Sequence, residues 1–113
     1  MMPVPAVLLS RSATDAAFTL TLAPACEAFQ GHFPGDPILP GVVQVDWAIG
    51  LGLEAFGDLG PFRGLDQVKF LAPIRPLEPV TLSLSLEPGK LRFLYTSGEV
   101  RKASGTVRVG GAP

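Results

Sequence analysis

The chain has 113 residues, of which 47% are hydrophobic, and a formal net charge of −1. Because a domain usually takes roughly 100–200 residues, this length predicts one small domain over residues 1–113. A mean hydropathy of +0.36 argues against disorder, and a pI near 5.7 argues against nucleic-acid binding, which favours strongly basic domains.

Membrane insertion and secretion are not expected from the hydropathy pattern. No segment reaches the roughly 18 uncharged apolar residues that a membrane-spanning helix needs. Residues 1–10 lack the basic region and the cleavage site of a signal peptide. Cys26 is the single cysteine and cannot form an intramolecular disulfide, which agrees with a reducing compartment. We therefore expect a cytoplasmic protein.

The chain begins with two predicted strands and a long loop. Residues 6–9 form a short apolar run and residues 17–22 alternate apolar with small polar side chains, which predicts a hairpin with its turn at 10–15. Periodicity then disappears over residues 23–40, where glycines and prolines recur. A loop of this length in so small a domain is usually functional.

Residues 41–56 are predicted to form a helix. The apolar residues at helical spacing are Val42, Val45, Ile49, Leu53 and Phe56. Because the segment is apolar nearly all round, we expect other structure to surround it. Gly50 and Gly52 weaken a helix by about 1 kcal/mol each relative to alanine, so close packing against a neighbouring backbone is their expected role. Residues 57–60 are expected to end the helix.

The remaining segments return to a period of two. We predict strands at 63–71, 80–86, 90–96 and 100–109, with a turn or bulge at 72–76 and a tight hairpin turn at Pro88-Gly89. The predicted fold is therefore α+β: an antiparallel sheet of five or six strands wrapped around one long central helix. The sheet face that carries serine, threonine, lysine and arginine is expected to face water.

Two side chains are the main candidates for catalysis. His32 is the only histidine and lies in the constrained loop. A single histidine also serves often as a structural residue. Asp46 has Val42, Ile49 and Leu53 as helical neighbours, so it projects from an apolar stripe and a raised pKa is expected. Alternatively, Asp46 lies at the edge of the apolar stripe, caps another element or meets Arg63 or Lys69.

His32 and Asp46 together fit acid–base catalysis better than either does alone. A neutral imidazole and a protonated carboxyl group form a base and an acid suited to neutral pH. Between them, Gly41 and Val42 at the helix start offer free N–H groups that stabilise a developing oxyanion. This set suits proton abstraction next to a carbonyl, followed by loss of a leaving group. With one histidine and one cysteine, a cysteine/histidine metal site is not expected.

The sequence GHFPGDPILPG at 31–41 closely resembles the signature of the bacterial 3-hydroxyacyl-acyl-carrier-protein dehydratases. These are hot-dog-fold proteins in which this motif leads into the central helix. The segment QVDW at 44–47 is most similar to the small dehydratases found with aryl polyene biosynthesis. Residues 68–74 also resemble the strand and turn that follow the helix in this family. The resemblance covers roughly residues 20–90.

The resemblance implies a role for each matching residue. His32 would remove the C2 proton of a (3R)-3-hydroxyacyl thioester, and Asp46 would protonate or orient the departing 3-hydroxyl group. The N–H of Gly41 would hold the thioester carbonyl, and the product would be the trans-2-enoyl thioester. The family uses no cofactor or metal. It takes its substrate from an acyl carrier protein and forms homodimers or larger homo-oligomers, with His32 of one protomer facing Asp46 of the other.

Two further sets of residues have open interpretations. The residues that would line an acyl tunnel, or simply form core, are Phe33, Val42, Trp47 and Phe56. The basic residues that would meet an acidic carrier protein, or form a solvated sheet face, are Arg63, Lys69, Arg75, Lys90, Arg92, Arg101, Lys102 and Arg108. Two other functions remain open: a hot-dog thioesterase in which Asp46 activates water, and a non-catalytic acyl-binding or partner-binding hot-dog subunit.

Overall fold

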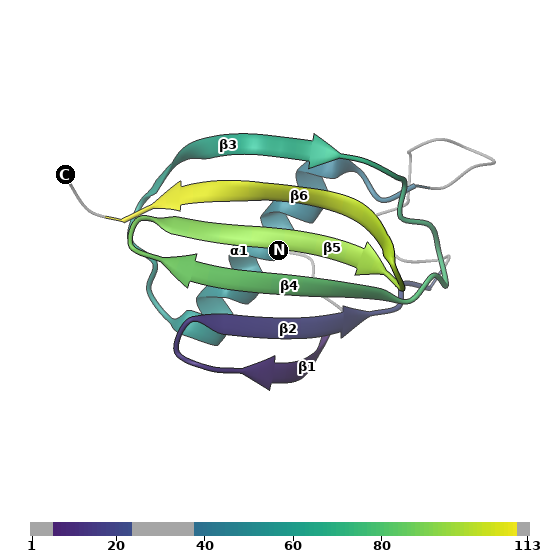
Figure 1. The fold of residues 1–113 in the computed structure, drawn as a ribbon, viewed down its shortest axis with the longest axis horizontal. Coiled ribbons are helices and arrows are strands. Elements are labelled where there is room, and N and C mark those ends of the chain that lie inside the picture. Colours follow the sequence, from purple (N-terminus) through teal and green to yellow (C-terminus); the bar gives the residue numbers. More distant parts are fainter. Residues whose placement is uncertain (1–5, 24–37, 111–113) are drawn as a thin grey trace.

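The computed structural model describes residues 6–23 and 38–110. The elements are β1 (Ala6–Arg11), β2 (Asp15–Leu20), α1 (Gly41–Phe56), β3 (Phe62–Phe70), β4 (Val80–Glu87), β5 (Lys90–Ser97) and β6 (Val100–Val109). The strands form one antiparallel six-stranded sheet in the order β1-β2-β4-β5-β6-β3. Helix α1 crosses one face of this sheet diagonally (Figure 1). The predicted α+β arrangement of a sheet on one long helix is confirmed.

The first hairpin is present, but its strands differ from the predicted ones. β1 continues to Arg11 and β2 begins at Asp15, so the turn is shorter than the predicted 10–15 segment. Ser12 explains the tight turn, because its Oγ accepts hydrogen bonds from the N–H groups of Thr14 and Asp15 at 3.3 and 3.0 Å. Such side-chain bonds to nearby backbone are typical of serine in turns.

Helix α1 has the predicted bounds. It follows Pro40, and the N–H of Gly57 donates to the Leu53 carbonyl at its end. Gly57 has φ 83°, a positive value that glycine adopts more readily than other residues, and the helix ends there. The positions of Pro40 and Gly57 in the sequence therefore predicted both ends of the helix correctly.

The buried face of α1 differs from the predicted stripe. The residues buried against the sheet are Gln44, Trp47, Ala48, Leu51 and Gly52. The predicted stripe lies toward the other side, where Val42 is 77% and Leu53 is 45% exposed and the other members are half-buried. The sheet covers one side of this helix, so within the described residues the expectation that other structure surrounds the helix is met on that side only.

The two helix glycines also differ from each other. A Cβ on Gly52 would lie 2.7 Å from Leu91 Cδ2, so Gly52 is closely packed, but against a side chain and not against the predicted backbone. In the described part of the chain, no atom lies within 4 Å of the position that a Cβ of Gly50 would take, so the prediction of close packing was wrong for Gly50.

The core lies between α1 and the inner face of the sheet. β4 and β5 alternate buried and more exposed residues over their length and meet at the predicted two-residue turn, where Glu87 pairs with Lys90. Leu82, Leu91, Tyr95 and Val107 supply fully buried side chains. β3 forms the edge of the sheet beside β6, and its register shifts twice. No described helix is long and apolar enough to cross a membrane.

Candidate active site

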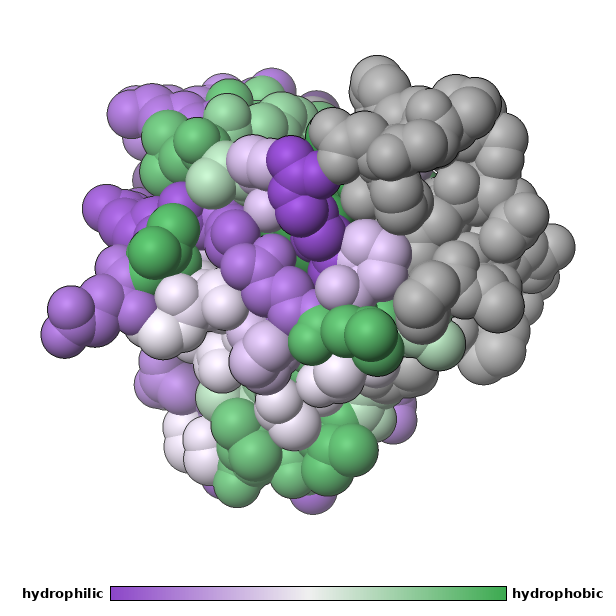
Figure 2. Space-filling view, turned by 90° about the vertical axis from the view of Figure 1, so that its right-hand side faces the viewer, coloured by the Kyte–Doolittle hydropathy of each residue, from purple (hydrophilic) through white to green (hydrophobic). Residues whose placement is uncertain are grey.

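A cavity of about 420 Å³ opens where α1 begins. We call it the helix-start cavity; it is lined by Ile38, Leu39, Pro40, Gly41, Gln44, Phe70, Leu71, Ala72 and Pro73. The cavity brings the segment before the helix against the end of β3. Figure 2 views the molecule from this end and shows exposed apolar side chains interspersed with polar ones. The size is that of a typical small-molecule site.

The first turn of α1 presents unpaired N–H groups at this cavity. Pro40 precedes the helix and makes no side-chain cap, and the first turn contains no acidic residue. Among the described residues, the N–H groups of Gly41 and Val42 have no backbone partner. The positive end of the helix dipole is therefore available to a carbonyl or anionic oxygen.

Gly41 also allows the close approach of Phe70. A Cβ at residue 41 would lie 2.6–2.9 Å from three atoms of the Phe70 ring. Such a contact is too short, so the ring can pack on the helix start only because residue 41 lacks a side chain. The resemblance gave Gly41 a role through its N–H group. The structure adds a steric reason for glycine, which is the close approach of the Phe70 ring.

Lys102 forms hydrogen bonds to residues 71–73, the segment after β3 that lines the cavity. Its backbone carbonyl accepts hydrogen bonds from the N–H groups of Leu71 and Ala72 at 2.8 and 3.1 Å. Its ammonium group donates to the Pro73 carbonyl at 2.9 Å and pairs with Glu78 at 2.7 Å. One buried lysine therefore fixes the backbone of the segment that leaves β3.

The Glu78 carboxylate responds to this environment. Partial burial by itself raises its pKa, but hydrogen bonds from Lys102 and from the N–H of Arg75, together with the charge of Lys102, hold the pKa below its usual value. The ion pair is thus favoured at neutral pH, where both groups are charged.

Gln44 connects the helix to the segment before it. Its Nε2 donates to the Leu39 carbonyl at 3.0 Å, while the Leu39 N–H donates to the Ile74 carbonyl at 2.9 Å. The Gln44 backbone carbonyl accepts a hydrogen bond of 2.6 Å from the hydroxyl of Tyr95. This chain of hydrogen bonds runs from the segment after β3, through the helix start, to β5.

The Tyr95 hydroxyl acts only as a donor in this series of hydrogen bonds. Its side chain is fully buried, and burial raises the pKa of its hydroxyl, as does the nearby charge of Asp46 to a lesser extent. The hydroxyl therefore stays protonated and donates to Gln44 throughout the physiological pH range.

The predicted catalytic pair is not assembled within the described residues. His32, like Phe33, lies outside them. Asp46 is exposed on α1 and does not line the helix-start cavity, because two residues of separation place it on roughly the opposite side of the helix from Gln44. The structure thus brings Gly41 and Gln44 together at the cavity but does not bring Asp46 to it.

The residues predicted for an acyl tunnel lie in different environments. Trp47 is 2% exposed within the core and Phe56 is half-buried against it. Val42 projects outward. None of these three lines one of the cavities described here.

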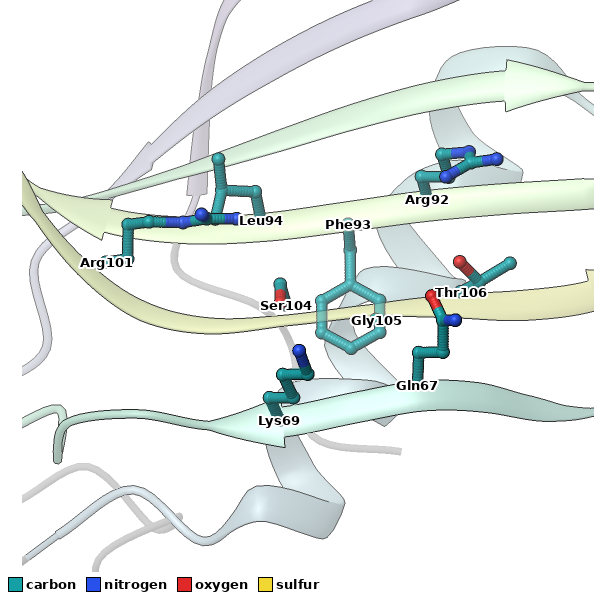
Figure 3. A pocket seen from close by; sticks show the side chains of 9 residues that line it. All are labelled: Gln67, Lys69, Arg92, Phe93, Leu94, Arg101, Ser104, Gly105 and Thr106. Carbon is teal, nitrogen blue, oxygen red and sulfur yellow. The ribbon is translucent and has the colours of Figure 1, made fainter.

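A second hollow of about 300 Å³ lies on the outer face of the sheet (Figure 3). Lys69 of β3, Arg92 of β5 and Arg101 of β6 line it. Arg92 pairs with Glu87, whereas no ion pair joins Lys69 or Arg101 to another described residue. Lys69 is also the neighbour of Phe70, which lines the helix-start cavity.

Only part of the predicted basic set shares this outer surface. Arg108 lies on the same sheet face but pairs with Asp66 at 3.1 Å. Lys102 is buried and pairs with Glu78, so it does not belong to an accessible basic surface. The basic residues of the predicted set therefore differ in the structure: some line the outer hollow, and others are paired with an acidic residue or buried.

Sequence reasoning missed Gln44, Tyr95 and Lys102 as residues that shape the site. Gln44 gave a signal, because it is a polar residue within a run of valines at the start of the helix. Tyr95 and Lys102 gave none, since their partners are far away in the sequence. The described residues contain no group of three or more potential metal ligands.

Comparisons with known proteins give a consistent result. A family described as ApeI-like, the ApeI dehydratase, matches residues 9–106. The chain is similar to the 3-hydroxyacyl-acyl-carrier-protein dehydratase FabZ of Caldanaerobacter subterraneus subsp. tengcongensis, with 35% identity over 89 residues. That match covers 73% of this chain and 58% of the relative. The chain spans about half the length of the curated relatives it matches.

Solved structures agree on the fold. The dehydratase heterocomplex ApeI:P from Xenorhabdus doucetiae matches with a TM-score of 0.86 and 27% identity, over 96% of this chain and 97% of that one. Thioesterase superfamily member 2 from Mus musculus matches with a TM-score of 0.72 and 13% identity, over 94% of this chain and 83% of that one. The latter likeness concerns the fold alone, and together the two confirm the hot-dog architecture.

Proposed function

Because the chain belongs to the ApeI-like dehydratase family, we propose that it removes water from (3R)-3-hydroxyacyl thioesters carried by an acyl carrier protein. The products are the trans-2-enoyl thioester and water. The structural observation that supports this proposal is the helix-start cavity: Gly41, whose N–H has no backbone partner among the described residues, lines a space of substrate size. A thioester carbonyl that accepts this N–H becomes easier to convert into an enolate.

The proposed steps balance without a cofactor. His32 takes the C2 proton, and the electron pair moves toward the carbonyl, where the Gly41 N–H stabilises the developing charge. The C3–O bond then breaks, and the departing hydroxyl takes a proton from Asp46 and leaves as water. Proton exchange between the two residues and solvent restores both of them.

A second copy of the chain would complete this site. Asp46 is exposed on α1, on the side that the sheet of its own chain does not cover. In a homodimer, this carboxyl group would face His32 of the partner. The dehydratase similar in structure is described as a heterocomplex, so a related but different chain is the alternative partner.

The test measures hydration and dehydration of acyl-carrier thioesters by the purified protein. We expect His32→Ala and Asp46→Asn each to lower kcat/KM by about 10²–10⁴-fold, the usual contribution of a general acid or base. Glu54→Gln is the matched control, because Glu54 is an exposed carboxylate on the same helix. Its rate should equal that of the wild type.

Three outcomes would contradict the proposal. Release of free thiol without dehydration would indicate a thioesterase. Tight binding of acyl thioesters without any turnover would indicate a non-catalytic subunit. A wild-type rate for either the His32 or the Asp46 variant would refute the role given to that residue.

A further inference from the structure

Gln44, one of the residues that line the helix-start cavity, carries an unused hydrogen-bond acceptor. The residue is 3% exposed, lines the cavity, and its Oε1 is buried without a hydrogen-bond partner. The orientation of the amide is fixed, because Nε2 donates to the Leu39 carbonyl and a carbonyl can only accept. The unpaired atom is therefore an oxygen.

An unpaired buried oxygen calls for an explanation, since most buried polar groups in native proteins have partners. The N–H groups of Leu71 and Ala72, which also line the cavity, both donate to Lys102 and are not available to this oxygen. A ligand that brings a donor would remove the penalty of the unpaired oxygen. A ligand without a donor would leave the penalty in place.

The position of Gln44 indicates what kind of ligand this is. Gly41 and Gln44 are three residues apart, so they lie on the same face of the first helical turn. One supplies a free N–H donor and the other a free oxygen acceptor. The complementary ligand has a carbonyl oxygen and a hydroxyl group a few bonds apart, which is the arrangement of a 3-hydroxyacyl thioester.

We propose that Gln44 Oε1 accepts a hydrogen bond from the 3-hydroxyl group of the acyl substrate and selects hydroxylated over non-hydroxylated acyl chains. This inference rests on the proposed function and assigns it a specificity residue. In the proposed dimer, Asp46 of the second copy would protonate the oxygen of this hydroxyl group while its hydrogen is donated to Gln44 of the first copy, so the two residues do not compete. The enoyl product lacks the hydroxyl group and loses the contact.

The experiment compares binding of two unreactive ligands of equal chain length. One is a 3-hydroxyacyl pantetheine with an amide in place of the thioester, and the other is the matching saturated acyl compound. We expect the wild type to prefer the hydroxylated ligand, and Gln44→Met to reduce this preference about tenfold, the usual effect of one hydrogen bond. Gln67→Met is the control, because it makes the same change at an exposed position.

A second variant separates recognition from structural damage. In the Gln44→Glu variant, a protonated carboxyl group can donate to the Leu39 carbonyl and still offer its other oxygen to the ligand. The preference should therefore return as the pH falls, because protonation restores the arrangement of the amide. A preference that stays lost at every pH would overturn the inference.

The remaining outcomes are also decisive. Equal loss of affinity for both ligands in the Gln44→Met variant would show a structural role only, and unchanged affinities would show no role. Either result, in a protein that dehydrates its substrate, refutes the inference and leaves the proposed function intact. A wild type that binds neither ligand and turns over no thioester refutes both.

Discussion

Lys102 shows at the scale of one residue how a charge is used inside this fold. It is 8% exposed, and its partners Glu78 and the Pro73 carbonyl satisfy two of its three donors. A buried lysine is costly unless it is paired. The pair is therefore expected to stabilise the segment 71–73, which lines the helix-start cavity.

The pH dependence of stability should report this ion pair. The pKa of Glu78 is lowered in the folded chain, so its carboxylate stabilises the fold at neutral pH, and this contribution disappears as the pH falls through the folded pKa. We expect Glu78→Gln to lower the free energy of unfolding by about 1 kcal/mol at pH 7, the upper range for a partly exposed pair. The difference should shrink below the ordinary value of 4.5.

Denaturant unfolding across the acid range measures this effect. Glu87→Gln is the control, because the Glu87–Arg92 pair is about half exposed and its loss should cost less than about 0.5 kcal/mol. A Glu78→Gln variant as stable as the wild type at pH 7 would show that the pair does not stabilise the segment 71–73.

Helix α1 shows which properties of an element follow from its own sequence. Pro40 and Gly57 set its ends through backbone geometry, which is local, and the predicted bounds were correct. The buried face was not predictable, because a helix that is apolar all round contains no dominant stripe. Packing against the sheet buried Trp47 and Leu51 and left Val42 and Leu53 exposed.

Two alanine substitutions should separate packing from helix propensity within α1. Gly52→Ala is expected to lower the free energy of unfolding by about 1–3 kcal/mol, because the new Cβ would meet the fully buried Leu91 at 2.7 Å. Gly50→Ala is the matched control and should raise it by up to about 1 kcal/mol, since no atom lies within 4 Å and alanine favours helix. Equal effects in thermal or denaturant unfolding would contradict this explanation.

The whole molecule leaves an apolar surface uncovered beside the site. Leu65 and Phe70 of the edge strand β3 are 42% and 53% exposed, and the helix residues Val42 and Leu53 are exposed as well. An edge strand with exposed apolar residues invites pairing with another chain. This surface supports the proposed homodimer, in which Asp46 would lie at the interface.

Sedimentation analysis of surface variants tests this proposal. We expect the wild type to sediment as a dimer and Leu65→Lys to shift it toward monomer, because a charge would be buried at the interface. Val7→Lys makes a comparable change on β1, the opposite edge of the sheet, where Val7 is 63% exposed, and should leave the dimer intact. A monomeric wild type, or a dimer disrupted only by Val7→Lys, would contradict the proposal.

The fold was largely predictable because its signals are local. Alternation with a period of two marked the strands, and glycine and proline marked the turns and the helix ends. Strand bounds were less accurate, as the first hairpin shows, because turn length depends on side-chain bonds such as those of Ser12. The dense motif before the helix indicated the dehydratase family, which the match over residues 9–106 confirms.

The site was only partly predictable. By itself, the sequence determined the elements, the helix start at Gly41 and the family, since backbone preferences and motif spacing act over short distances. Only tertiary structure decided that Gln44 turns inward, that Tyr95 and Lys102 anchor the cavity, and that Asp46 faces away from the sheet of its own chain. The contacts of Tyr95 and Lys102 join segments 51 and 29 residues apart in the sequence, so no local pattern encodes them.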